Sequence, residues 1–290
     1  MSIERITTLP PLPPRPSDGH KGTFGRVLVV GGSEGMIGAP VFSGTSALRM
    51  GSGLVQIATP RAILHAALSI TPELIGVSLG KTVGKDLLAA VEAADAVVLG
   101  PGLGKSLEAR ERVKRLIRFD KPMVIDADAL NILAARKSWP REFHAKAVLT
   151  PHPGEMKRLA KLFNRLDVPS DEDSRIDIAL KAATTFDQVI VLKGHRTVVT
   201  DGKRVYINRT GDSTLSKAGT GDVLSGIIGS LLGQGQGGME RFDAACAGVH
   251  IHGRAGELAG KKLGQRCALA REIIDAIPAA IAEYDRAVGE

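Results

Sequence analysis

A carboxylate follows two glycines and precedes an apolar segment in KAGTGDVLSGIIGSLLGQG, residues 217–235. From Leu224 onward the apolar residues recur three and four positions apart, which predicts a helix with one buried face. Gly219 and Gly221 lie just before this helix, where backbone N–H groups can approach an anion closely. Asp222 at such a position is either a helix cap or a residue that takes part in chemistry, and this segment alone leaves both possibilities open.

Other reactive side chains follow short apolar runs that alternate with amphipathic segments. This alternation predicts an α/β fold with a mostly parallel sheet covered by helices on both faces. The expected strands lie within residues 25–33, 54–60, 95–104, 122–130, 147–155, 188–196 and 204–210. Ligands of such sheets bind beyond the carboxyl ends of the strands. We therefore expect one site built from the polar or glycine-rich segments Gly31–Ser33, Gly100–Gly104, Asp126–Asp128, Thr150–His152, Lys193–Gly194 and Gly219–Asp222.

Four of these residues each admit two interpretations. His152 stands between two prolines, which stiffen the loop and suit a preset contact with a ligand; the alternative is a structural role. Lys193 would place an ammonium group at the rim of the site, or is a solvated lysine. Asp126 and Asp128 either hold Mg²⁺ through water or cap the next helix and bond loop backbone.

Three motifs suggest other functions but do not fit them. GPGLGKS, residues 100–106, has three residues rather than four between its first glycine and the Gly-Lys pair, so it is not a phosphate-binding P-loop. GQGQGG, residues 233–238, matches a dinucleotide fingerprint but follows a predicted helix instead of a strand. The two histidines of residues 250–252 point to different faces of a helix, which disfavours a metal site. A hydride-transferring dehydrogenase is therefore poorly supported.

Composition narrows the class of partner. The chain has 290 residues, of which 43% are hydrophobic and 3% aromatic, and its formal net charge is +7. The basic residues are scattered without interleaved aromatic side chains, so a phosphate-bearing small molecule fits better than nucleic acid. A generally solvated basic surface is an equally good interpretation of the charge.

Other features bear on compartment and domain organisation. Cys246 and Cys267 form neither a disulfide framework nor a zinc motif. No apolar run reaches the roughly 18 residues of a membrane span, and we find no signal peptide. We expect a cytoplasmic protein without a membrane contact. The prolines of residues 1–17 predict an extended, poorly packed arm, followed by a single domain over residues 18–290.

Six segments in chain order resemble one enzyme family. They are HKGTFGRVLVVGGS followed by GAP, VVLGPGLG, VIDADALN, LTPHPGE, VLKGHRT and AGTGDVLSGIIG. Together they are similar to the ADP/ATP-dependent NAD(P)H-hydrate dehydratases, over about residues 19–260. GTGD occurs in other ribokinase-like enzymes as well, whereas LTPHPGE together with the first segment is more specific. The resemblance implies a ribokinase-like three-layer sandwich.

The resemblance also implies a repair reaction. NADH or NADPH that is hydrated at C6 of the nicotinamide ring would be phosphorylated on that hydroxyl by ADP, and phosphate would then leave. Mg²⁺ is expected with the nucleotide, and ADP or ATP as co-substrate. Expected partners are a separate NAD(P)H-hydrate epimerase and further copies of this chain. A ribokinase-like kinase of a vitamin precursor and a non-catalytic nucleotide-binding regulator are the alternatives.

The family pattern assigns roles residue by residue. Asp222 matches the residue that takes the hydroxyl proton. The positions that match contacts to the hydrated dinucleotide are Ala39, Gly102, Gly104, His152 and Asp222. Those that match contacts to the adenine nucleotide are Lys193, Gly194, His195, Arg196, Thr197, Gly219, Thr220 and Gly221. No metal ligand is assigned. Two positions depart from the pattern: Met36 stands where many members have tyrosine, and Asp212 stands where many have asparagine.

Overall fold

The computed structural model describes residues 3–289, apart from 137, 166, 169, 236 and 237. The strands in these residues are β1 (Glu4–Ile6), β2 (Arg26–Val30), β3 (Leu54–Pro60), β4 (Ile75–Leu79), β5 (Ala96–Leu99), β6 (Pro122–Ile125), β7 (Lys146–Leu149), β8 (Val189–Leu192), β9 (Val198–Thr200) and β10 (Arg204–Ile207).

The helices in the same residues include two short 3₁₀ segments, η1 (Lys161–Phe163) and η2 (Ser213–Leu215). The α-helices are α1 (Gly38–Arg49), α2 (Arg61–Ile70), α3 (Lys85–Ala93), α4 (Leu107–Leu116), α5 (Ala127–Ala134), α6 (Trp139–Glu142), α7 (Pro153–Ala160), α8 (Glu172–Phe186), α9 (Thr220–Gly233), α10 (Arg241–Leu263) and α11 (Ala270–Gly289).

All ten strands form one sheet in the order β1-β10-β9-β8-β7-β6-β5-β2-β3-β4. Each neighbouring pair is parallel except the two pairs that involve β9, which runs antiparallel between β8 and β10. The prediction of a mostly parallel sheet is confirmed. Because β2 and β5 to β8 run in the same direction side by side, their carboxyl ends meet at one edge of the sheet.

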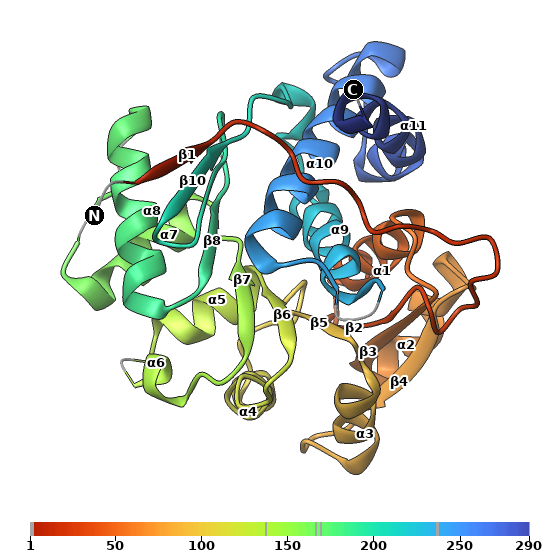
Figure 1. The fold of residues 1–290 in the computed structure, drawn as a ribbon. Coiled ribbons are helices and arrows are strands. Elements are labelled where there is room, and N and C mark those ends of the chain that lie inside the picture. Colours follow the sequence, from red (N-terminus) through yellow and green to blue (C-terminus); the bar gives the residue numbers. More distant parts are fainter. Residues whose placement is uncertain (1–2, 137, 166, 169, 236–237, 290) are drawn as a thin grey trace.

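Helices cover both faces of this sheet, which confirms the three-layer prediction (Figure 1). The alternation along β2 shows why: Val27 and Val29 are buried against one group of helices, whereas Leu28 and Val30 are buried against the other. The first group comprises α1, α2, α9, α10 and α11. The second comprises α3 to α8. Aliphatic side chains buried on both faces of a strand are what a central strand of such a sandwich requires.

Small residues bring α1 and α9 into close contact. Ser43, Gly44, Ser46 and Ala47 are buried on α1. On α9, a Cβ atom added at Gly226 would lie 2.0 Å from the backbone oxygen of Ser43, so no larger side chain fits there. This contact fixes the position of the start of α9 relative to the sheet.

The N-terminal arm is better anchored than the proline content suggests, so the prediction of poor packing is wrong. β1 pairs with β10 at the edge of the sheet, and the arm then runs across the helices of one face (Figure 1). The Tyr284 hydroxyl donates a hydrogen bond to the backbone oxygen of Pro10, at 2.6 Å. The Arg15 guanidinium donates to the Gly51 oxygen and lies 3.8 Å from the Phe24 ring centroid. The domain boundary at residue 17 stays a prediction.

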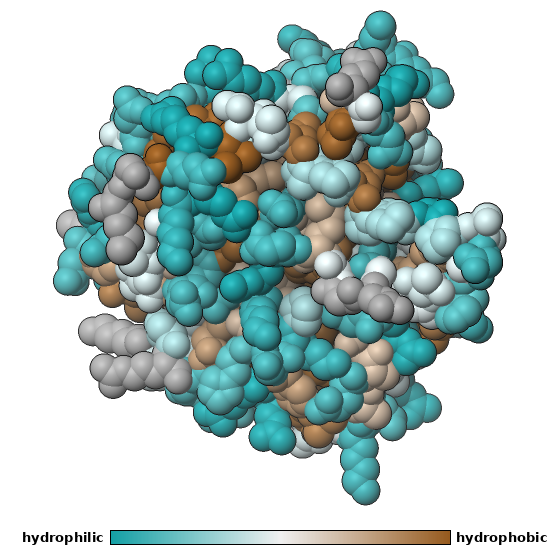
Figure 2. Space-filling model, viewed as in Figure 1, coloured by the Kyte–Doolittle hydropathy of each residue, from teal (hydrophilic) through white to brown (hydrophobic). Residues whose placement is uncertain are grey.

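The surface has no extended apolar region on the face that Figure 2 shows. Hydrophilic side chains cover most of it, and hydrophobic residues occur in small separate patches. Among the helices within the described residues, none combines the length and the apolar character needed to cross a membrane.

Candidate active site

The predicted site segments meet at the carboxyl edge of the sheet. Asp126, His152 and Lys193 follow β6, β7 and β8, which are neighbours in the sheet. The loops after β2 and β5 continue the same edge. The close contacts between these loops are direct: a Cβ atom added at Gly100 would lie 1.9 Å from the backbone oxygen of Asp126.

Asp222 lies in the first turn of α9 but is not its cap. Gly219 is the N-cap residue, with φ +89°, and no side chain caps this helix. A side chain at Gly219 would also collide with the Phe42 ring, because its Cβ would lie 2.8 Å from that ring. The capping interpretation of Asp222 is therefore wrong, and the uncapped first turn of α9 leaves its N–H groups available to an anion.

The backbone of Asp222 is held firmly, so its side chain has a defined place. Its backbone oxygen accepts hydrogen bonds from the hydroxyl groups of Ser43, at 2.9 Å, and Ser225, at 2.8 Å. These two hydroxyl groups lie 3.0 Å apart. Ser43 belongs to α1 and Ser225 to α9, so the tight contact between the two helices positions the carboxylate.

Lys193 is the central cation of the site. Its Nζ lies 2.8 Å from Asp126 Oδ1 and 3.9 Å from Glu155 Oε2. The Lys193 side chain is 19% exposed, and the two carboxylates are buried. Burial lowers the pKa of Lys193, but the attraction of Asp126 and Glu155 outweighs it and the pKa is raised. The ammonium group therefore stays charged, and the interpretation of Lys193 as a merely solvated lysine is wrong.

The same ammonium group is close to the start of α9. A Cβ atom added at Gly221 would lie 3.5 Å from Lys193 Nζ. A cation and the uncapped N-terminus of a helix thus face the same space. Both favour negative charge, so this corner of the site can bind phosphate.

Two carboxyl groups here have strongly raised pKa values. Burial raises the pKa of Asp222 to about 7, and the negative charge of Asp126 adds to this effect while Lys193 opposes it. Burial likewise raises the pKa of Glu155 to about 7, against the opposing charge of Lys193. A carboxyl group whose pKa is near the working pH can both accept and release a proton.

His152 lies at the start of α7, with its ring Nε2 3.5 Å from Glu155 Oε1. The ring is half exposed, and its Nδ1 accepts a hydrogen bond from the backbone N–H of Gly154, at 2.9 Å. Its backbone N–H donates to Glu155, which completes a capping box at the start of α7. Burial and the charges of Lys193 and Arg158 lower the pKa of His152. The neutral ring therefore carries its proton on Nε2, where it can donate a hydrogen bond.

The loops after β2 and β5 form the opposite wall. A Cβ atom added at Gly102 would lie 3.0 Å from Ala39 Cβ, so these two predicted residues are adjacent. The N–H of Gly104 donates to Asp128 Oδ2, at 2.9 Å, and Asp126 caps α5. Asp126 thus caps a helix and Asp128 bonds loop backbone, as the structural interpretation predicts, whereas their binding of Mg²⁺ through water stays a prediction. Met36, beside Gly102, is 43% exposed.

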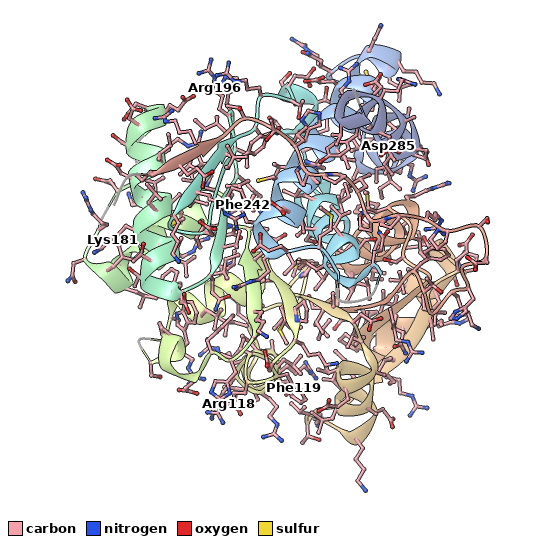
Figure 3. All side chains as sticks on the ribbon, viewed as in Figure 1. Arg118, Phe119, Lys181, Arg196, Phe242 and Asp285 are labelled. Carbon is pink, nitrogen blue, oxygen red and sulfur yellow. The ribbon has the colours of Figure 1, made fainter. Side chains whose placement is uncertain are left out.

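A cavity of about 410 Å³ opens on the other side of Lys193. Its walls include all of Lys193–Thr197 together with Thr220 and Gly221, so it brings together most residues of the expected nucleotide segment. Gly219 is not part of the wall but precedes it as the N-cap of α9. Arg196, labelled in Figure 3, is at the outer rim, where its guanidinium lies 2.8 Å from Glu172.

Arg175 supports this wall, and the sequence contained no signal for it. The residue is 8% exposed, and its guanidinium donates hydrogen bonds to the backbone oxygens of Leu192, Lys193 and His195. An α8 side chain that satisfies several loop carbonyls at once can be found only when the tertiary contact is known.

Two further residues line this wall: His252, which the sequence did not assign to the nucleotide, and Asp212, whose departure from the family pattern predicted altered nucleotide contacts. His252 is 7% exposed, and burial lowers its pKa to about 4, so it is neutral. Asp212 caps η2 and accepts a hydrogen bond from Gln265, at 2.8 Å. Of the GQGQGG segment, residues 236 and 237 lie outside the described residues, and Gly233 ends α9.

Comparison with known proteins relates this geometry to one family. A family model described as NAD(P)H-hydrate dehydratase matches residues 27–279. A bifunctional NAD(P)H-hydrate repair enzyme of Moorella thermoacetica is 42% identical over 278 residues, which cover 92% of this chain and 51% of that protein. The chain thus spans about half the length of such bifunctional relatives. An ADP-dependent (S)-NAD(P)H-hydrate dehydratase of Neisseria meningitidis is 38% identical over 257 residues, with coverage of 86% and 82%.

Solved structures agree with the fold. One of them is an ADP/ATP-dependent NAD(P)H-hydrate dehydratase of Bacillus subtilis, co-crystallized with ATP and Mg²⁺. It superposes on this chain with a TM-score of 0.79 at 30% sequence identity, and the aligned part covers 94% of this chain and 95% of that one. A ribokinase-like superfamily protein of Enterococcus faecalis gives the same TM-score at 26% identity, with coverage of 94% and 92%. The ribokinase-like prediction is confirmed.

Proposed function

We propose that this chain, which belongs to the NAD(P)H-hydrate dehydratase family, converts hydrated NADH or NADPH back to the reduced dinucleotide at the expense of an adenine nucleotide. One observation carries the proposal: Asp222, with a pKa raised to about 7, stands in an uncapped helix start beside the cation Lys193. This arrangement supplies a base and an anion site next to each other, as transfer of a phosphoryl group to a hydroxyl requires.

Asp222 removes the proton from the C6 hydroxyl as that oxygen attacks the terminal phosphoryl group. The N–H groups at the start of α9 and the Lys193 ammonium hold the negative oxygens of the transferred group. Transfer from ADP forms the C6 phosphate ester and releases AMP. The lone pair of the ring nitrogen then expels phosphate from C6, and loss of a proton from C5 restores the ring double bond. Hydroxide is a poor leaving group, which is why phosphorylation comes first.

His152 and the wall formed by Ala39, Gly102 and Gly104 orient the hydrated ring. His152 Nδ1 accepts from Gly154, and its Nε2 lies 3.5 Å from Glu155 Oε1, so the ring would donate to the substrate in place of that contact. Glycines at 102 and 104, both with positive φ, allow the ring to approach the backbone closely. The cavity beyond Lys193, walled by residues 193–197, holds the adenine nucleotide.

ADP is the proposed phosphoryl donor, with ATP as the alternative, and Mg²⁺ accompanies the nucleotide. The described residues contain no group of three or more His, Cys, Asp and Glu side chains that could hold a metal. Mg²⁺ commonly keeps several waters and binds through substrate phosphates and one or two carboxylates. The cation would arrive with the nucleotide and neutralise the charge of its phosphates beside Lys193.

The decisive experiment is to incubate the purified protein with hydrated NADH, Mg²⁺ and either ADP or ATP. We expect the absorbance of the reduced nicotinamide to return, together with stoichiometric phosphate and AMP or ADP. A stable phosphorylated product without free phosphate would instead identify a small-molecule kinase. Nucleotide binding without turnover would identify a regulator.

We also propose a cytoplasmic location, a functional pairing with a separate epimerase and assembly into a homo-oligomer. The support is the family membership, since an epimerase would supply the hydrate epimer that the dehydratase consumes. Light scattering after gel filtration measures the assembly. Adding an NAD(P)H-hydrate epimerase to the dehydration assay should extend turnover from one epimer of the hydrate to both.

A further inference from the structure

The turn between β8 and β9, residues 193–197, is held from behind by one buried guanidinium group. Nη2 of Arg175 donates to the backbone oxygens of Leu192, at 3.2 Å, and Lys193, at 3.3 Å. Its Nη1 donates to the oxygen of His195 and lies 3.5 Å from that of Arg196. A planar guanidinium with its fixed fork of donors can bond several carbonyl groups at once. The backbone of the turn thus converges on a single side chain of α8.

These carbonyl groups are the close partners of the Arg175 charge. The residue is 8% exposed, and burial lowers its pKa, while the negative charge of Glu172 opposes this effect. The carboxylate of Glu172 pairs instead with the Arg196 guanidinium, at 2.8 Å. Among the described residues Arg175 belongs to no ion pair, so the turn itself satisfies the buried guanidinium.

The turn has a backbone conformation that needs such support. Carbonyl groups of adjacent residues that face the same side require a departure from the extended strand. Gly194 provides this departure with φ +137°, and Arg196 has φ +53°, in the left-handed region that residues other than glycine adopt infrequently. Backbone of this kind persists where surrounding contacts over-determine it. The hydrogen bonds from Arg175 are contacts of that type.

The same geometry directs backbone N–H groups away from Arg175. The described peptide bonds are trans, so each carbonyl group and the N–H group of the next residue point in opposite directions. The carbonyl group of Lys193 faces Arg175, so the N–H group of Gly194 points away from it. The N–H group of Arg196 follows the carbonyl group of His195 and points away in the same manner.

These two N–H groups are available to a ligand. Neither of them has an acceptor within the described part of the chain. The whole turn lines the cavity of about 410 Å³, whereas Arg175 is not part of its wall. The turn therefore separates Arg175 from the cavity, and the N–H groups of Gly194 and Arg196 are on the cavity side.

Lys193 does not depend on Arg175 for its place. Its backbone N–H donates to the Pro151 oxygen, at 2.9 Å, and its ammonium group lies 2.8 Å from Asp126. Loss of the Arg175 side chain should thus disturb the backbone donors of the turn and leave the ammonium group where it is.

We propose that Arg175 is a positioning residue for the adenine nucleotide, because it holds the N–H groups of Gly194 and Arg196 ready to donate to the bound nucleotide. Donors that are fixed before binding need not be ordered when the ligand arrives. Backbone N–H groups that face a concavity bind anions, and the phosphates of the nucleotide are such groups. This inference rests on the proposed function, which places the nucleotide in this cavity.

Calorimetric titration of Arg175→Ala tests the inference, with ADP or ATP, whichever the wild type binds more tightly. Kd should rise about tenfold, the effect of losing one charge-assisted hydrogen bond. In the dehydration assay KM for the nucleotide should rise by a similar factor. The values of kcat and of KM for hydrated NADH should stay within about twofold of wild type, because only ground-state binding of the nucleotide is lost.

Arg112→Ala is the matched control. Arg112 is 6% exposed, its guanidinium donates to the backbone oxygen of Gly80, and burial lowers its pKa, but it does not line the cavity. This variant also loses a buried guanidinium group and should melt at a lower temperature, yet its Kd for the nucleotide should equal that of the wild type.

Two measurements separate positioning from a merely structural role. Guanidinium chloride at low millimolar concentration should restore nucleotide affinity to Arg175→Ala, whereas the same concentration of potassium chloride should not. Arg175→Lys keeps the positive charge and most of the side chain, so it should fold even if Arg175→Ala does not. Its Kd should still be raised severalfold, because an ammonium group cannot reproduce the fork of donors.

Wild-type nucleotide affinity in Arg175→Ala or in Arg175→Lys would overturn the inference, and so would an equal loss of affinity in Arg112→Ala. Equal effects of the two salts would reduce Arg175 to a structural residue. A wild type that binds ADP or ATP without dehydrating the substrate would refute the proposed function, while the calorimetric comparison of the variants still decides the role of Arg175. A wild type that binds neither nucleotide would overturn both.

Discussion

Replacing Asp222 by asparagine separates the chemical role of this residue from any structural one. Asparagine has almost the same size but is neutral and cannot take up the hydroxyl proton. The helix start should be undisturbed, because Gly219 rather than Asp222 is the N-cap and the hydrogen bonds from Ser43 and Ser225 go to the backbone oxygen. The fold should therefore persist while turnover is lost.

The expected loss of turnover is about 10²- to 10⁴-fold, the usual contribution of a positioned proton transfer. ADP binding should persist or tighten slightly, because a negative charge beside the phosphates is removed. The wild-type rate should also depend on pH. With the pKa of Asp222 at about 7, the ionised fraction, and with it kcat, should rise about tenfold between pH 6 and pH 8. Asp222→Asn should lose this dependence.

Stability should change in the opposite sense. The folded protein raises the pKa of Asp222 from 3.8 to about 7, so it binds the proton more tightly than the unfolded chain does. The folded state is therefore destabilised as pH rises from about 4 to about 7. Each pKa unit corresponds to about 1.4 kcal/mol, so the ionised carboxylate costs on the order of 4 kcal/mol above pH 7. Asp222→Asn should melt at a higher temperature than wild type at pH 8, and at nearly the same temperature at pH 4.

The assay measures dehydration rates from pH 6 to pH 8, ADP titrations and melting curves on the same preparations. Activity of Asp222→Asn within about threefold of wild type would refute the role of Asp222 as the base, given the size of such effects. A melting temperature below that of wild type at pH 8 would refute the electrostatic reasoning, even if turnover is lost.

Three further substitutions test other parts of the site. Lys193→Ala leaves two buried carboxylates without their cation, so the free energy of unfolding should fall by about 3–5 kcal/mol. KM for ADP should rise more than KM for hydrated NADH, and the reverse order of KM changes would contradict the assignment of Lys193 to the nucleotide. His152→Ala should raise KM for hydrated NADH and leave ADP affinity nearly intact, and a lower melting temperature with unchanged KM would mean that the residue is only a cap. Gly226→Ala would place a Cβ 2.0 Å from the Ser43 backbone oxygen. In urea unfolding this variant should be less stable by about 1–3 kcal/mol, and its kcat should fall. An unchanged urea midpoint of unfolding would be inconsistent with the tight contact between α1 and α9.

The sequence by itself determined the elements and the edge at which they meet. Apolar runs such as Val27–Val30 predicted buried strands, and the periodicity after Leu224 predicted α9. Both patterns are local, because a strand repeats every two residues and a helix every 3.6. Parallel strands place their carboxyl ends on one edge, so the polar segments that follow them could be assigned to one site from residue order alone.

Only the tertiary structure decided what those residues do to one another. Lys193 and Asp126 are 67 residues apart in the chain, and their ion pair exists because β6, β7 and β8 are neighbours. The pKa values of Asp222 and Glu155 depend on burial and on charges from other elements, which no spacing encodes. The packing of β1 against β10 likewise joins residues about two hundred positions apart. Local repeats fix the elements, whereas electrostatics and side-chain contacts arise from distances between elements, and these exist only in the folded chain.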